Sequence, residues 1–483
     1  MKLRFVSVFL ILIFFPALII SCGGSISTTS SESSESSQSS ESSSQSDGQD
    51  EFGTQTGEYP SASNDEDFTE VMLPSSRSRS SSRTSVPETP APEPPAVPTP
   101  QPPPTAVNHD GEIISIWFSY IDWGSFLQGK TEENFNKQVD TIIKATKSIG
   151  ANNLIIHATA FGDATYKSDL LPWSSYASGA ISKDPGFDPF AVFAERAAAQ
   201  GVSVEAWVNP MRSFTNAQFA SVPDGYRVKQ WWNNTAARHR YMIQDSGGRW
   251  WLNPANPEVR SHIAEVCGEI AAKYQVRAVH IDDYFYPTGL RNTNDDLAYY
   301  NEQNPGISIE NWRRSSTKSM IKQMHDAIKA ADSSVLFGIS PSGNIDYNLN
   351  TMFVDFASML GTAGYMDYIA PQIYFGFNNA ARPFEQCLTE WNAMVTEPSI
   401  RLHVGLAAYK IGQTDEWAGA AGKDEWIAVA AGSNDMLSRK IQYSRTKQKY
   451  AGVMFFAYNS FFTASGEFQP ATKREIENIV RVL

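Results

Sequence analysis

The chain of 483 residues has few cysteines and fewer basic than acidic side chains. Cys22, Cys267 and Cys387 are too few for a disulfide framework, and the last two fall in separate predicted helices, so a disulfide is not favoured. Lys and Arg total 39 against 52 Asp and Glu, which gives a net charge of −13. Because phosphate binding requires concentrated positive charge, this balance argues against nucleic acid as a partner.

The amino terminus has an apolar run from Phe5 that is short for a permanent membrane span. Lys2 and Arg4 precede the run, and together they have the pattern of an export signal. The residues before Cys22 resemble a bacterial lipobox, which implies a lipoprotein signal peptide over residues 1–21 and acylation of Cys22. The chain is then expected in the cell envelope, held to a membrane by the lipid on Cys22 and facing outside the cytoplasm. An uncleaved anchor is the alternative.

Residues 22–107 are predicted to be a disordered linker. Ser dominates from Gly23 to Asp47, and prolines recur from Pro87 to Pro104. The first composition buries too little apolar surface to fold, and the second favours an extended polyproline stalk. We therefore expect one folded domain, over residues 108–483.

The folded part alternates short apolar runs with amphipathic segments. The predicted strands are Ile113–Phe118, Asn153–Ala158, Val202–Val208, Arg277–Asp282, Val335–Ser340, Tyr368–Tyr374, Leu402–Tyr409 and Gly452–Tyr458. The predicted helices are Glu132–Ile149, Pro189–Gln200, Pro257–Tyr274, Asn311–Ala331, Thr351–Leu360, Phe384–Val395, Asp435–Gln448 and Pro470–Val482. Eight such repeats predict an α/β fold, a closed (β/α)8 TIM barrel, with an open doubly wound sheet as the weaker alternative.

Two adjacent carboxylates, Asp282 and Asp283, close the fourth predicted strand. In a barrel, residues just beyond each strand converge on one mouth, where catalytic groups gather. The predicted lining of this mouth consists of aromatic and amide side chains with few cations: Trp117, His157, Trp207, Asn209, Arg212, Tyr284, Tyr286, Ser340, Gln372, Tyr374, Tyr409 and Tyr458. Such a lining suits an uncharged polyhydroxylated substrate better than a phosphate ester.

Several motifs resemble those of one known family. In order they are Glu205-Ala206-Trp207-Val208-Asn209-Pro210, Trp251-Leu252-Asn253-Pro254, His280-Ile281-Asp282-Asp283-Tyr284-Phe285-Tyr286-Pro287, Gly338-Ile339-Ser340-Pro341, Tyr368-Ile369-Ala370-Pro371-Gln372-Ile373-Tyr374 and Gly405-Leu406-Ala407-Ala408-Tyr409-Lys410. They are similar to the motifs of the glycosyl-hydrolase-like 10 family of bacterial lipoproteins, over nearly all of residues 110–483. The resemblance implies a (β/α)8 barrel and glycoside hydrolase activity, with peptide-free peptidoglycan glycan chains as the expected substrate. One departure is Glu205, where the family more often has His; a buried partner for Arg or Lys is its expected role.

The carboxylate pair indicates a particular mechanism. No Asp or Glu closes the fifth, sixth or eighth strand, so a separate nucleophile is not visible. The pair resembles that of substrate-assisted N-acetylhexosaminidases, in which the 2-acetamido oxygen of the substrate attacks the anomeric carbon.

This mechanism assigns a role to each of several side chains. Asp283 is the expected general acid/base, and Asp282, pointing into the barrel, orients the acetamido group. Tyr374 is expected to donate to the acetamido oxygen, and Trp207 and Tyr458 to form its apolar wall. Asn209 and Gln372 are expected to bind hydroxyls.

Other interpretations remain open at this stage. His157 is either a hydrogen-bonded barrel residue or a base, and Arg212 either a substrate clamp or the ion-pair partner of a carboxylate such as Glu205. The aspartates are either catalytic, structural, or, with His280, part of a metal cluster; we predict no metal and no cofactor. The alternative functions are a non-catalytic surface glycan-binding barrel and a hydrolase of another polysaccharide. The oligomeric state is not indicated.

Overall fold

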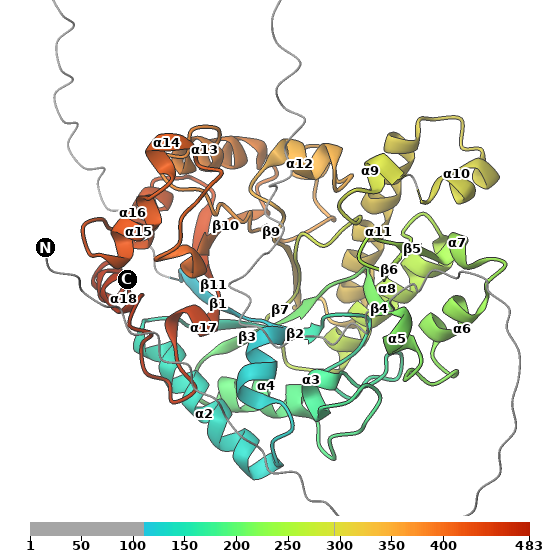
Figure 1. Cartoon of the computed structure of the whole chain (residues 1–483), viewed down its shortest axis with the longest axis horizontal. Helices are drawn as coiled ribbons and strands as arrows, with labels where there is room; N and C mark the ends of the chain where they lie inside the picture. Colours follow the sequence, from blue (N-terminus) through green and yellow to red (C-terminus); the bar gives the residue numbers. More distant parts are fainter. Residues whose placement is uncertain (1–110, 294) are drawn as a thin grey trace, which may run out of the picture. The chain divides into compact units, whose positions relative to one another are not determined.

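The computed structural model describes residues 111–293 and 295–483. The predicted signal peptide, Cys22 and the linker lie outside these residues. Eight parallel strands form a closed barrel in the order β1-β11-β10-β9-β8-β7-β3-β2, surrounded by helices (Figure 1). The strands are β1 (Ile113–Phe118), β2 (Asn153–Thr159), β3 (Ser203–Val208), β7 (Ala278–Ile281), β8 (Leu336–Ile339), β9 (Tyr368–Ile369), β10 (Arg401–Ala407) and β11 (Tyr450–Phe456). The (β/α)8 prediction is confirmed, and the open-sheet alternative is wrong.

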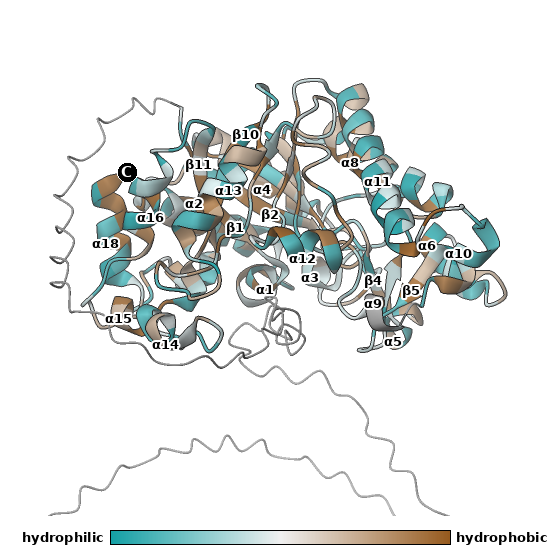
Figure 2. Ribbon diagram, turned by 90° about the horizontal axis from the view of Figure 1, so that it is seen from above, coloured by the Kyte–Doolittle hydropathy of each residue, from teal (hydrophilic) through white to brown (hydrophobic). Residues whose placement is uncertain are grey.

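The main helices cover the barrel from outside and expose their polar faces (Figure 2). They are α2 (Glu132–Ser148), α4 (Pro189–Ala199), α8 (Pro257–Lys273), α11 (Ile309–Ala331), α13 (Phe384–Met394), α16 (Leu437–Ser444) and α18 (Lys473–Val482). Side-chain caps fix where several of them begin. Thr131 accepts from the backbone of Asn134, and Asn256 caps α8, which has proline at its first turn.

Two predicted elements differ from the structure. The segment Thr351–Leu360 is not a helix; the short α12 (Ile345–Asn350) precedes it, and Phe353 has a left-handed φ of 53°, which a continuing helix cannot accommodate. The sixth strand, β9, is only 2 residues long and stops short of the predicted end at Tyr374, because Pro371 offers no backbone N–H to the ladder. Beyond it, Gln372 pairs with Ser342 and Gly405 through isolated bridges.

The long connection after β3 builds a small antiparallel sheet at one side of the barrel (Figure 1). Its strands are β4 (Arg212–Thr215), β5 (Met242–Gln244) and β6 (Arg249–Leu252), and three short helices, α5 (Asn216–Phe219), α6 (Arg227–Asn233) and α7 (Arg238–Tyr241), accompany it. Arg212 pairs directly with Trp251 across β4 and β6. The hairpin therefore brings two sequence-distant segments together beside the end of β3.

A buried polar network crosses the barrel interior. Glu205 is fully buried and forms an ion pair with Arg277, which confirms its predicted role as a buried partner for a basic residue. Its second oxygen accepts from the hydroxyl of Tyr368 at 2.5 Å, and that hydroxyl lies 2.8 Å from Nδ1 of His280. Nε2 of His280 lies 2.8 Å from the hydroxyl of Ser340. The network links the amino ends of the strands to the level just below the aspartates.

Gly338 makes this network sterically possible. The strand register places Gly338 between His280 on β7 and Tyr368 on β9. A Cβ atom at position 338 would lie 1.8 Å from the ring of Tyr368, so only glycine leaves room for the tyrosine.

Two further observations concern the sequence predictions. Cys267 and Cys387 are both buried and free, so the disulfide that was not favoured is not formed. Across residues 111–293 and 295–483, the structure contains no helix of the length and apolarity needed to cross a membrane.

Candidate active site

The two aspartates lie at the barrel mouth, where β7 ends. The strand stops at Ile281, and Asp282 and Asp283 follow it. Asp282 is only 3% exposed, and its Oδ1 accepts a hydrogen bond from the backbone N–H of Tyr284 at 3.0 Å. The backbone N–H of Phe285 donates to the carbonyl of Asp283 at 2.9 Å. This tight turn ends the strand and fixes both carboxylates at the mouth.

Both aspartates have raised pKa values. Burial, together with repulsion from Asp283, holds the pKa of Asp282 well above its usual value of 3.8. Removal from water raises the pKa of Asp283 to about 6, although Gln372 and Arg212 favour its charged form. Since one negative charge disfavours the second, the pair retains a proton near neutral pH. A carboxyl group that keeps its proton there is suited to act as a general acid.

A buried polar atom of the pair is available for a ligand. Oδ2 of Asp282 and Nε1 of Trp207 are close enough to interact electrostatically. Neither atom has a partner with hydrogen-bond geometry in the described part of the chain. Buried polar atoms are nearly always satisfied, so these two have unused hydrogen-bonding capacity at the mouth.

Arg212 stacks between two rings beside the pair. Its guanidinium lies 4.0 Å from the ring centroid of Tyr284 and 4.5 Å from that of Phe161. It interacts electrostatically with Asp282 and Asp283. Glu205 pairs with Arg277, so the carboxylates that Arg212 interacts with are those of the aspartate pair and not Glu205. Both the substrate-clamp prediction and the ion-pair alternative with a carboxylate remain compatible with this position.

Three aromatic side chains form a wall beside the pair. The ring centroids of Tyr374 and Tyr409 lie 5.8 Å apart, and both residues interact electrostatically with Asp283. Phe456, the last residue of β11, lies 6.3 Å from Tyr374 and 6.0 Å from Tyr409. Gln372 is adjacent to Asp283 and donates through Nε2 to the carbonyl of Ser340 at 2.9 Å.

His157 belongs to the wall formed by β2 and β3. Its ring stacks on Trp207 with centroids 3.4 Å apart, and its Nδ1 accepts from the backbone N–H of Tyr120 at 3.0 Å. Burial holds its pKa well below the usual 6.5, so the ring is neutral with its proton on Nε2. Asn209 donates to the carbonyl of Ala160 at 3.2 Å. This arrangement agrees with a hydrogen-bonded barrel histidine.

Trp117 and Ser340 lie deeper than the aspartates. Trp117 is 1% exposed and packs edge-on against His280 at 5.8 Å and against Phe456 at 6.0 Å. Ser340 is fully buried and bonded to His280. These positions form the floor beneath the site and do not fit the predicted direct contacts with substrate. Both ring nitrogens of His280 are engaged by Tyr368 and Ser340, which argues against the metal-cluster alternative.

Two predicted lining residues point elsewhere. Tyr286 is fully buried and packs on Phe353, because the turn at Asp283 redirects the backbone that follows the strand. Tyr458 begins the short helix α17 (Tyr458–Phe461) and packs on Phe118 at 5.4 Å, so it turns away from the mouth. Their predicted substrate contacts, including the acetamido wall at Tyr458, do not fit these positions.

Sequence reasoning missed Phe456 and Arg249. Phe456 takes the place expected for Tyr458, with its ring 6.4 Å from that of Trp207. A prediction that ended the last strand two residues earlier, at Phe456, would have placed this residue at the mouth. Arg249 reaches Phe161 at 4.3 Å from the distant strand β6, and only the hairpin pairing reveals this contact. The mouth therefore carries more positive charge than predicted.

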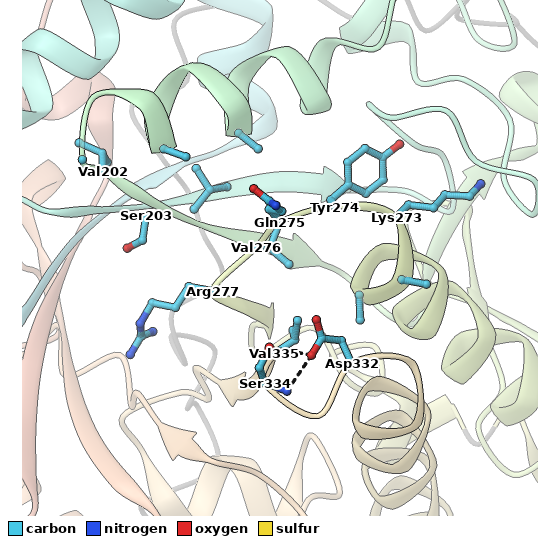
Figure 3. A pocket seen from close by; sticks show the side chains of 16 residues that line it. Val202, Ser203, Lys273, Tyr274, Gln275, Val276, Arg277, Asp332, Ser334 and Val335 are labelled. Carbon is cyan, nitrogen blue, oxygen red and sulfur yellow. Dashed lines mark hydrogen bonds between the residues drawn. The ribbon is translucent and has the colours of Figure 1, made fainter.

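The pocket in Figure 3 lies at the other end of the barrel. It encloses about 720 Å³ and is bordered by residues that precede β3, β7 and β8, among them Val202, Val276 and Val335. Arg277 lines it from the start of β7 (Figure 3). Catalytic groups of barrels gather at the carboxyl ends of the strands, so this pocket is separate from the aspartate pair.

A closed (β/α)8 barrel with a buried aspartate pair among aromatic and amide side chains at its mouth is an arrangement typical of glycosidases. Residues 112–419 match the model of the glycosyl hydrolase-like 10 family, and the chain belongs to this family. The match ends before β11, so it is shorter than the resemblance to residues 110–483 predicted.

Named relatives and solved structures are similar to the chain. The glycosyl hydrolase DigH of Escherichia coli (strain K12) is 30% identical over 338 residues, which cover 65% of this chain and 76% of DigH. The glycosyl hydrolase YngK of Bacillus subtilis (strain 168) is 31% identical over 325 residues, 62% of each chain. The PgaB (BpsB) glycoside hydrolase domain from Bordetella bronchiseptica aligns with a TM-score of 0.47 and 14% identity, covering 77% of this chain and 98% of the domain.

Proposed function

We propose that the protein hydrolyses O-glycosidic bonds in the N-acetylated glycan chains of bacterial cell wall, with peptide-free peptidoglycan as the preferred form. The observation that carries the proposal is the adjacent aspartate pair, which is buried at the mouth, has raised pKa values and leaves Oδ2 of Asp282 without a partner in hydrogen-bond geometry among the described residues. A pure binding protein gains nothing from a desolvated pair of like charges. The names of the relatives DigH and YngK support hydrolysis.

Acetamido-assisted retention is the mechanism that these residues support best. Asp282 Oδ2 accepts the acetamido N–H, which turns the acetamido oxygen toward the anomeric carbon. Asp283 is less buried and, in its protonated form, gives its proton to the leaving oxygen. As the bond to that oxygen breaks, the acetamido oxygen bonds to the anomeric carbon and closes an oxazolinium ring. The Asp283 carboxylate then takes a proton from a water molecule that attacks the anomeric carbon and reopens the ring. The same residue thus serves as acid and then as base.

The surrounding side chains position the sugar for this step. The hydroxyl of Tyr374 donates to the acetamido oxygen, and the stacked His157 and Trp207 with Phe456 enclose the acetamido methyl group. The carbonyl oxygen of Asn209, buried without a partner among the described residues, accepts from a sugar hydroxyl. The protein works outside the cytoplasm, anchored through lipid on Cys22, with residues 22–107 as spacer.

Incubation with defined glycans tests the proposal. The substrates are peptide-free glycan chains, intact peptidoglycan and a polysaccharide without acetamido groups, and fragments are identified by mass. Cleavage of the peptide-free chains, with less from intact wall and none from the third glycan, is the expected pattern. Fragments from the non-acetylated polysaccharide alone would reject the proposed substrate. Binding of glycan without any cleavage would favour the glycan-binding alternative.

A further inference from the structure

Two guanidinium groups contact the same ring at the barrel mouth. Phe161, just beyond the end of β2, lies 4.5 Å from Arg212 and 4.3 Å from Arg249, measured from each guanidinium carbon to the ring centroid. The repulsion between the two cations adds to the effect of burial and lowers the pKa of Arg249. Two like charges held beside one ring are costly unless an anion joins them.

Arg249 is fixed in place by a backbone carbonyl, and the charges of Asp245 and Asp163 favour its charged form without forming an ion pair with it in the described part of the chain. Its Nη1 donates to the carbonyl of Ser213 at 2.7 Å, and the side chain is only partly exposed. In residues 111–293 and 295–483, no Asp or Glu forms an ion pair with it. Asp245, in the same hairpin, is occupied, since its oxygens accept from the backbone of Arg249 at 2.9 Å and from the indole of Trp251 at 2.7 Å.

The position of the two arginines connects this charge to the substrate. Arg212 interacts with the aspartate pair on one side and with Arg249 on the other. A sugar bound at the aspartates therefore has its neighbour, or a substituent, within reach of Arg249. A guanidinium fork recognises planar anions, and carboxylates above all, through paired hydrogen bonds.

We propose that Arg249, together with Arg212, binds a carboxylate carried by the glycan, namely the free lactyl carboxylate of N-acetylmuramic acid. This inference rests on the proposed function. In peptide-bearing chains the same carboxyl group is consumed in an amide bond, so it loses its charge and carries a bulky peptide. The arginine site thereby gives a physical reason for selecting peptide-free chains. A glycan with uronic acids offers the same chemistry from a different part of the sugar.

The test compares ligands that differ only at this carboxyl group. Peptide-free glycan chains are used either untreated or with their lactyl carboxyls converted to methylamides, and hyaluronan oligosaccharides supply ring carboxylates beside N-acetylated sugars. Cleavage (kcat and KM) and binding by calorimetry are measured with the full-length protein. Binding is measured in the Asp283→Asn background, so that it reports on the arginines even without turnover.

Arg249→Gln is the test variant and Arg238→Gln is its matched control. Arg238 belongs to the same insertion, but its guanidinium stacks between Trp232 and Trp250, 5.1 Å from each. For the protein with both arginines intact, we expect amidation to raise KM and Kd about tenfold to a hundredfold, the effect of one charge-assisted hydrogen bond. Arg249→Gln should weaken binding of untreated chains equally and abolish the difference. Arg249→Lys should retain part of it, and Arg238→Gln all of it.

Each other outcome has a definite meaning. Equal binding of untreated and amidated chains by the protein with intact arginines overturns the inference, as does discrimination that survives Arg249→Gln. Binding of hyaluronan but not of peptide-free chains, dependent on Arg249, replaces the lactyl group by a uronate. If the unmodified protein binds untreated chains more tightly than amidated chains but cleaves neither, the arginine site is supported and the proposed hydrolysis is rejected. Thermal unfolding checks that all variants are folded.

Discussion

Replacement of Glu205 by Gln should destabilise the barrel by a calculable amount. Burial disfavours the charged form of Glu205, but the hydrogen bond from His280 and the charge of Arg277 outweigh it, and the pKa falls from 4.5 to about 2. At 1.36 kcal/mol per pKa unit, folding stabilises the ionised carboxylate by about 3 kcal/mol. This agrees with the cost of breaking a buried ion pair, about 3–5 kcal/mol. Arg277 borders the pocket in Figure 3, so water can solvate it in the variant and keep the cost near the lower value.

The pH dependence gives the prediction its sign. Because the folded-state pKa of Glu205 is depressed, its stabilising contribution is complete above about pH 4.5 and disappears as the pH falls through about 2. Urea unfolding should therefore show a constant loss of about 3 kcal/mol in Glu205→Gln between pH 7 and pH 5. The loss should shrink below that range.

A matched exposed carboxylate provides the control. Glu133 pairs with Lys137 on α2, with both side chains mostly exposed, so Glu133→Gln removes the same charge and should leave the free energy of unfolding unchanged. A loss below about 1 kcal/mol in Glu205→Gln would refute the reasoning, because the network would then contribute no more than a surface pair.

Three further predictions follow from the same structure. Because the folded-state pKa of Asp283 is raised from 3.8 to about 6, its ionisation costs stability as the pH rises through that range. In urea unfolding, Asp283→Asn should therefore have a free energy of unfolding about 1–3 kcal/mol higher than the unaltered protein at pH 7 and an equal one at pH 3.5. A variant that is less stable at pH 7 would contradict the raised pKa. In pH profiles of the unaltered enzyme, kcat/KM should fall above about pH 6 as Asp283 ionises and can no longer act as the acid, whereas a rise toward pH 9 would exclude Asp283 as the acid. Gly338→Ala places a methyl group in the ring of Tyr368 and should lower the free energy of unfolding by about 3 kcal/mol or prevent folding. The control Gly225→Ala, which has open space around it, should unfold like the unaltered protein. Equal unfolding curves for the two variants would show that the barrel accommodates the added methyl group.

The regular strands and helices of the barrel are predictable because the hydrophobic pattern and capping residues of each segment favour the same element that the barrel requires there. The strand Ile113–Phe118 was predicted with its observed ends, and the helix that begins at Pro257 is set by Asn256 and the proline. Predictions failed where a single backbone feature overrides the pattern. Phe353 in the left-handed region excludes the helix predicted over Thr351–Leu360, although its apolar spacing is suitable.

The site was predictable at the level of strand ends but not of side-chain direction. Asp282 and Asp283 lie where the strand pattern placed them. Tyr458 and Tyr286 are predicted at the mouth only because they stand at or just beyond the end of a predicted strand, and the backbone turns where each true strand ends. Arg249 was inaccessible to such reasoning, because only the pairing of β6 with β4 brings it beside Phe161.

The most direct measurement is the activity of Asp283→Asn on peptide-free glycan chains, with product masses and reducing ends followed over time. Asp346→Asn, an exposed aspartate on α12, serves as the control. The account predicts that the control cleaves like the unaltered enzyme, and that Asp283→Asn is folded, binds the chains and releases no fragments. An Asp283→Asn protein that retains most of the activity would contradict the assignment of the aspartate pair as the catalytic centre.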